Sequence, residues 1–113
     1  MKKPIFFIAG IAVGLCTSHV GGQGAGSVAV LDTPGVYIEL LTLVPGQGSG
    51  QHSSIPGEVG IVVEGEVVLS SPAGRESLRA GKAYWLPGLT PHDIRNEGDR
   101  PAKIYVIATK RCD

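Results

Sequence analysis

The sequence lacks an excess of charge of either sign. Ten Lys and Arg residues balance ten Asp and Glu residues within 113 residues, and neither sign forms a long run. Such a chain has no electrostatic footprint for nucleic acid or for an anionic membrane surface. Polyanion binding is therefore not expected, and the length together with 42% apolar composition predicts one small packed domain.

Cysteine is equally scarce, with only Cys16 and Cys112 in the chain. If an N-terminal segment is removed together with Cys16, no intramolecular disulfide can form in what remains. Cys112 stands next to the C-terminus, and we interpret it as an exposed thiol rather than a catalytic one. Stability must then come from packing, from a metal or from a partner chain.

The chain also has no apolar run long enough to span a membrane comfortably. Its longest candidate, residues 5–16, has about a dozen residues where a transmembrane helix needs about 20. Because Lys2 and Lys3 precede this run, residues 1–22 are predicted to be a signal peptide, with the cleavage position left open between 18 and 26. The protein is thus expected to be exported to the periplasm or the extracellular space, with no stable membrane span after the signal is removed.

The N-terminus has three other interpretations. A lipoprotein signal at Cys16 is disfavoured because Leu15 is bulky where such signals carry a small residue. An uncleaved anchor is a further alternative, and so is a buried element of the domain. The Lys-Lys start and the Gly-rich tract 21–26 argue against the last of these, because the tract resembles a flexible join. The predicted segments after the signal peptide are a Gly-rich N-terminal segment at 23–30 and the folded domain at 31–113.

Glycine and proline are abundant, with 17 and 8 residues distributed along the whole chain. This distribution favours short strands joined by tight turns over helices, and predicts an all-β fold. We expect a hairpin at Glu64-Gly65-Glu66. The expected strands are residues 27–31, 36–44, 59–63, 67–69, 75–78, 83–86, 92–95 and 102–109.

Two stretches carry the chemistry: Gly46-x5-His52-x-Ser54-x3-Glu58-x6-Gly65 and Gly81-x5-Pro87-x4-His92-x3-Asn96. Together they offer two imidazoles and one carboxylate, a ligand set that divalent transition metals prefer. Turns at residues 55–57 and before His92 would let two distant hairpins bring these side chains together. His52, Glu58 and His92 are therefore the predicted metal ligands, with Glu58 alternatively acting as a base.

These stretches resemble the two motifs of the cupin superfamily, and the resemblance covers residues from about 27 to 109. It implies a double-stranded β-helix, or jelly roll, of about eight short antiparallel strands with a metal site inside, and it implies a homodimer. The sequence departs from the pattern at two positions. Ser54 replaces a histidine and is a poor metal ligand, and Leu89 stands where the second motif has glycine, a turn that we expect Gly88 to serve instead.

Residues beside the ligands are predicted to line the pocket. Gly60 is expected to widen it by leaving out a side chain, and either Tyr84 or Trp85 joins the wall, depending on register. Asn96 is expected to cap a turn through its side chain. The predicted lining residues are Ser54, Gly60, Val62 and Ile94.

Two functions follow from this reading. The first is a metal-dependent enzyme, dioxygenase-like or isomerase-like, that uses iron, manganese, nickel or zinc to act on a small molecule. The alternative is a non-catalytic binding or sensor module with a degenerate, metal-free site. A third interpretation is a structural protein that acts through its interactions. The sequence contains neither a Ser-His-Asp catalytic arrangement nor a phosphate-binding loop.

Overall fold

The computed structural model describes residues 26–53 and 57–110. The predicted signal peptide, Ser54 and Cys112 lie outside the described residues, so the division of the chain into segments stays a prediction. Within the described part, no helix is long and apolar enough to cross a membrane.

The described residues form eight strands and no helix. Every strand pairing is antiparallel, in a five-stranded sheet of order β2-β3-β9-β4-β7 and a three-stranded sheet of order β6-β5-β8. This arrangement confirms the predicted all-β jelly roll. The strands are β2 (Ser27–Asp32), β3 (Val36–Leu43), β4 (Glu58–Glu64), β5 (Glu66–Ser71), β6 (Gly74–Arg79), β7 (Ala83–Leu86), β8 (Asp93–Arg95) and β9 (Ala102–Thr109).

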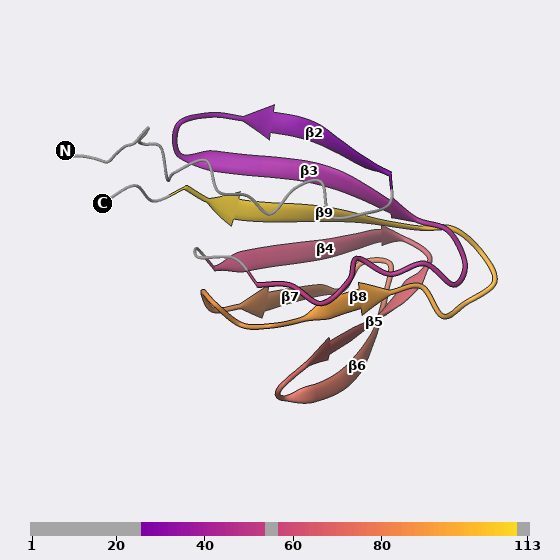
Figure 1. Cartoon of the computed structure of the whole chain (residues 1–113). Helices are drawn as coiled ribbons and strands as arrows, with labels where there is room; N and C mark the ends of the chain where they lie inside the picture. The colour runs from indigo at the N-terminus through magenta and orange to yellow at the C-terminus, as the bar shows by residue number, and fades with distance from the viewer. Residues whose placement is uncertain (1–25, 54–56, 111–113) are drawn as a thin grey trace.

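The core lies between the two sheets. In Figure 1, β2, β3, β9 and β4 lie side by side, with β8, β5 and β6 below them. Alternate residues of β9 are buried, as expected when one face of a sheet packs on a core. The buried cluster contains Leu41, Leu43, Val62, Val67, Leu69, Leu78, Tyr84, Leu86, Ile94, Ala102, Ile104 and Val106.

The turn at Gly65 does not form the predicted hairpin. Strand β4 pairs with β7 and β9, whereas β5 pairs with β6 and β8, so the chain changes sheets at this point. Gly65 has a φ of 78°, and a Cβ atom there would lie 2.6 Å from the carbonyl oxygen of Pro101. The tight turn is therefore real, but the pairing prediction was wrong, because turn residues determine local geometry and not which strands become neighbours.

The outer face of the five-stranded sheet carries two rows of apolar side chains, which we call the apolar rows. Each row consists of residues that are paired from strand to strand across all five strands. Trp85, on the edge strand β7, is 66% exposed. One row is Leu31, Ile38, Ile107, Val59 and Trp85, and the other is Val28, Leu40, Tyr105, Ile61 and Ala83.

Candidate metal centre

His52 and His92 are brought together by the backbone. Each residue donates its amide N–H to the carbonyl of the other, at 2.9 and 2.8 Å, in a bridge outside the named strands. The two imidazole rings are 4.2 Å apart between centroids. Glu58, the first residue of β4, joins them, and the three side chains form a group that can hold a metal ion, with ligand atoms within 4.8 Å of one another.

Backbone carbonyls select the tautomer of both histidines. Nδ1 of His52 lies 2.8 Å from the oxygen of Gly50, and Nδ1 of His92 lies 2.8 Å from the oxygen of Thr90. A carbonyl can only accept, so each Nδ1 must carry the proton and donate it. Nε2 of each neutral ring is then left with its lone pair, as a metal ligand requires.

The carboxylate of Glu58 is held from one side only. The hydroxyl of Tyr84 donates to Oε2 at 2.6 Å, and Nε2 of His92 lies 3.3 Å from the same oxygen without hydrogen-bond geometry. Oε1 of Glu58 and Nε2 of His92 are buried, and neither has a hydrogen-bond partner among the described residues. Buried polar atoms without partners are costly, and a bound cation would satisfy both, so the residues present fit a metal.

The pKa values of this group reflect burial opposed by close contacts. Burial raises the pKa of Glu58, but contacts with His92 and Tyr84 outweigh it, so the pKa is lowered. Burial lowers the pKa of His92, but Glu58 and the Thr90 carbonyl reverse the effect, so the pKa is raised. Burial, followed by the charges of Glu58 and Glu39, raises the pKa of Tyr84 well above 10.0.

A small cavity lies beside the ligands. It has room, about 10 Å³, for the centre of a single water-sized particle. Ile94 borders this cavity, whereas Val62 is fully buried in the core. The cavity is lined by Glu39, Leu41, Ser49, His52, Glu58, Ile94 and Val106.

Gly60 has a different effect from the expected one. A Cβ atom on Gly60 would lie 2.1 Å from Cε2 of Tyr84, so the ring of Tyr84 fills the space beside the glycine. The glycine therefore admits Tyr84 to the interior and does not widen the cavity. The register places Tyr84 inward and Trp85 outward, which settles the two alternatives.

Sequence reasoning missed Glu39 as a residue of the site. It lies on β3 with 2% of its surface exposed, and it borders the same cavity as His52 and Glu58. The signal for it was present, because an acidic side chain stands at an inward-facing position between the apolar residues of a strand. Nothing in the two motifs pointed to this position.

The loops of the second motif behave as turn chemistry predicts, with one exception. The Asn96 side chain donates to the carbonyls of Leu43 and Arg100 and accepts from the amide of Gly98, so it caps the loop as expected. Leu89 itself takes the left-handed backbone conformation, with a φ of 63°. The expectation that Gly88 would serve this turn was wrong, because the geometry falls on the residue that aligns with the motif's glycine.

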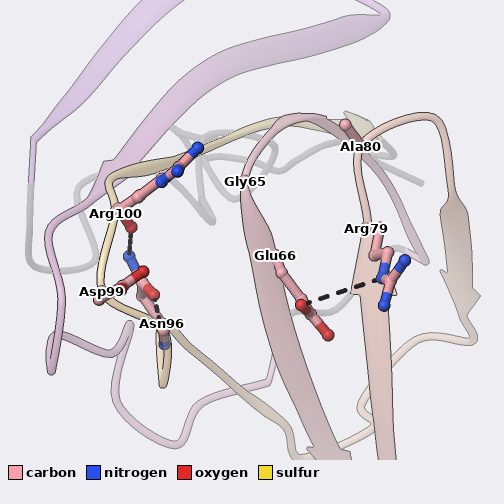
Figure 2. A pocket seen from close by; sticks show the side chains of 8 residues that line it. Gly65, Glu66, Arg79, Ala80, Asn96, Asp99 and Arg100 are labelled. Carbon is pink, nitrogen blue, oxygen red and sulfur yellow. Dashed lines mark hydrogen bonds and ion pairs between the residues drawn. The ribbon is translucent and has the colours of Figure 1, made fainter.

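A larger pocket of about 440 Å³ lies at the Gly65 turn, beyond the other end of β4. Figure 2 shows Glu66 facing Arg79, with 4.0 Å between the charged atoms, and Asn96 bound to the Arg100 carbonyl. The Glu66–Arg79 ion pair of this pocket is exposed, and the side-chain amide of Asn96 has hydrogen-bond partners for both its nitrogen and its oxygen. The unpartnered buried atoms of Glu58 and His92 therefore make the small cavity the better candidate site.

Comparisons with known proteins support the jelly-roll fold. A family model of the cupin domain, Cupin_2, matches residues 39–108. A structure from Thermus thermophilus is 27% identical, with a TM-score of 0.73 over 83% of this chain and 90% of that one. A comparison with curated proteins gave no match.

Two further structures share the fold. An RmlC-like cupin protein with a double-stranded β-helix from Methanocaldococcus jannaschii is 17% identical, with a TM-score of 0.71 over 83% of this chain and 92% of that one. A cupin-superfamily sugar phosphate isomerase from Silicibacter pomeroyi is 24% identical, with a TM-score of 0.67 over 75% of this chain and 59% of that one. At these identities the likeness shows the fold alone.

Proposed function

The chain belongs to the Cupin_2 family of cupin domains, and on that premise we propose that it binds one divalent transition metal and acts on a small molecule. His52, Glu58 and His92 would hold the metal, which is iron, manganese, nickel or zinc. The observation that carries this proposal is the pair of buried atoms, Glu58 Oε1 and His92 Nε2, that have no partner among the described residues.

When bound, the ion would supply a Lewis acid with coordination positions open to a small ligand. The protein's own contribution is to exclude water and to fix the donors. Gly50 and Thr90 hold the protons of the two histidines on Nδ1, and Tyr84 orients Glu58 through its hydroxyl. Where Glu58 does not ligate a metal, it can instead accept a proton, because its Oε1 is not engaged by any described residue.

Metal analysis of wild type, Glu58→Gln and Glu64→Gln tests this proposal. Glu64 lies on the same strand as Glu58 but is exposed, so Glu64→Gln controls for the loss of a negative charge. Wild type and Glu64→Gln should bind one ion per chain and melt higher with added metal, whereas Glu58→Gln should lose most of the affinity. Wild type that stays empty and does not gain stability with any of the four metals would rule out a metal-dependent function.

A second function, a binding or sensor module without catalysis, is favoured by the size of the cavity. Among the described residues, the cavity beside the ligands has room for a single water-sized particle, which is too small to enclose an organic substrate. The enzyme reading draws support from the Silicibacter pomeroyi protein, which is described as a sugar phosphate isomerase. Turnover of a panel of sugar phosphates and small oxidisable substrates by the metal-loaded protein, compared with Glu58→Gln, separates the two functions.

Export and self-association complete the proposal. Lys2, Lys3 and the apolar run at 5–16 support removal of a signal peptide, which intact mass measurement after expression in a bacterial host tests directly. The apolar rows support a homodimer, because they contain no charged side chain and extend over five strands.

A further inference from the structure

Two side chains of β8 hold the loop that leads to His52. Asp93 and Arg95 are alternate residues of this strand and lie on its outer face, whereas Ile94 between them is buried. The loop, residues 46–50, runs beside the strand and is joined to its backbone by hydrogen bonds. The two side chains therefore face a segment that ends next to a metal ligand.

Arg95 holds the beginning of this loop. Its Nη1 donates to the carbonyl of Gly46 at 3.1 Å. Gly48 lies directly against the guanidinium, since a Cβ atom on Gly48 would be 2.7 Å from Nη2 of Arg95, and only a glycine lets the backbone come this close. Nε of Arg95 also lies 3.6 Å from Oδ2 of Asp93 in a partly exposed ion pair, so the two side chains support each other.

Asp93 holds the end of the loop, next to His52. Its Oδ1 accepts the amide N–H of Gly50 at 3.0 Å, and the hydroxyl of Ser49 lies 3.5 Å from the same oxygen. The carbonyl of Gly50 is in turn the acceptor for Nδ1 of His52, at 2.8 Å. Gly50 thus connects the carboxylate to the imidazole, because Asp93 fixes its N–H and its C=O receives the proton of His52.

The position of Gly50 determines which nitrogen of His52 carries the proton. A neutral imidazole can be protonated on either nitrogen, and the hydrogen bond that one nitrogen makes decides between them. Among the described residues, the Gly50 carbonyl is the only hydrogen-bond partner of Nδ1 of His52. Gly50 is exposed, and glycine has more backbone freedom than any other residue, so this carbonyl needs an anchor to stay in place.

We propose that Asp93 is a positioning residue of the metal site, which acts through Gly50 to keep the proton of His52 on Nδ1 and Nε2 free for the ion. This inference rests on the proposed metal binding and extends it beyond the three ligands. The side-chain oxygen of asparagine can accept the same hydrogen bond, whereas alanine cannot, so Asp93→Asn and Asp93→Ala separate the hydrogen bond from the charge. If Asp93→Ala does not fold, Asp93→Ser replaces it, because its hydroxyl is one bond too short to reach Gly50.

The first measurement determines the tautomer of His52 in the metal-free full chain. Long-range proton–nitrogen correlation in the imidazole rings, at a pH where both rings are neutral, reports the protonated nitrogen. Wild type and Asp93→Asn should carry the proton on Nδ1, whereas Asp93→Ala should gain a population with the proton on Nε2. His92 is the internal control, because the Thr90 carbonyl holds its proton in all three proteins. An unchanged His52 tautomer in Asp93→Ala, or an equal change in His92, overturns the proposal.

The second measurement is Zn²⁺ affinity by competition with a chelator. Asp93→Ala should weaken binding by about 3- to 10-fold, as expected for one lost hydrogen bond, while Asp93→Asn should stay close to wild type. Asp99→Ala is the control, because it removes an exposed carboxylate at the pocket beyond the other end of β4. Equal losses in Asp93→Asn and Asp93→Ala would assign the effect to charge and overturn the proposal. If wild type binds none of the four metals, the proposed function fails, and the tautomer of His52 still decides the role of Asp93.

Discussion

The contact between His92 and Glu58 determines how the site responds to pH. The two atoms that face each other, Nε2 and Oε2, are 3.3 Å apart and buried. In the metal-free protein a proton on His92 makes this contact attractive, and that is why the pKa of His92 is raised against the effect of burial. A metal ion needs the same Nε2 lone pair, so proton and metal compete for it.

Metal affinity should therefore fall as the pH is lowered through the raised pKa of His92, with the loss beginning above the ordinary value of 6.5. Once His92 is largely protonated, the apparent affinity should drop by up to about tenfold per pH unit for this one proton. Titrations with a competing chelator at several pH values check this. Glu58→Gln removes the main interaction that raises the pKa of His92. The variant should bind metal more weakly, and its affinity should begin to fall at a lower pH than in wild type.

Metal affinity rises with pH, but the stability of the metal-free protein should fall as the pH rises on the alkaline side. A raised pKa means that His92 contributes stability below 6.5 and loses it as the pH rises through the folded-state value. The lowered pKa of Glu58 contributes stability above 4.5 and loses it as the pH falls through the folded-state value. Melting temperature in chelator should therefore be highest between these limits, and a rise toward alkaline pH would contradict the pairing.

The backbone conformation of Leu89 should lower the stability of the protein by a measurable amount. It adopts a φ of 63°, and its side chain is 66% exposed, so backbone strain there is offset by little packing. Leu89→Gly should stabilise the protein by about 0.5 to 1 kcal/mol, measured by urea unfolding. Leu89→Ala retains the strain and should not stabilise; equal gains in both variants would point to the exposed side chain instead.

At the scale of the strands, Gly60 on β4 and Tyr84 on β7 fit together as a pair. They are opposite each other in the ladder, and the missing Cβ atom of Gly60 leaves the space that the Tyr84 ring fills. This packing directs the hydroxyl of Tyr84 to Glu58. One glycine thus links the pairing of two strands to the orientation of a metal ligand.

Gly60→Ala should destabilise the protein by about 1 to 3 kcal/mol, since the ring must move. In a Tyr84→Leu background, which lacks the contacting ring carbons Cε2 and Cζ and the hydroxyl oxygen Oη, the added cost of Gly60→Ala should fall well below that value. Urea unfolding of the four proteins in this cycle gives the coupling. Gly35→Ala is the control, because a Cβ atom there meets nothing within 4 Å.

Strands are also where prediction from the sequence worked best. The expected ranges 83–86 and 102–109 agree with Ala83–Leu86 and Ala102–Thr109, because alternation of apolar residues and the turns that bound them are local signals. The partners of β4 and β5 could not be read this way, since pairing depends on residues far apart in the chain. For the same reason, the motif spacing predicted His52, Glu58 and His92 as a group, which the structure does bring together, but gave no information about Glu39.

At the scale of the whole molecule, the two faces of the five-stranded sheet differ in what covers them. The inner face packs against the three-stranded sheet, whereas no described segment covers the apolar rows on the outer face. In a two-fold dimer the same surface meets itself, which suits the apolar rows because they contain no charged side chain that pairing would bury. A second copy of the chain is the occupant that we propose.

Sedimentation velocity should accordingly show wild type at twice the mass of one chain and Trp85→Glu or Ile107→Glu shifted toward the monomer. Both substitutions place a charge in the first apolar row, where dimerisation would bury two like charges across the two-fold axis. Val44→Glu is the matched control, because Val44 is an apolar residue, 50% exposed, that lies outside the rows. A monomeric wild type, or a dimer that survives both row substitutions, would show that this face does not mediate self-association.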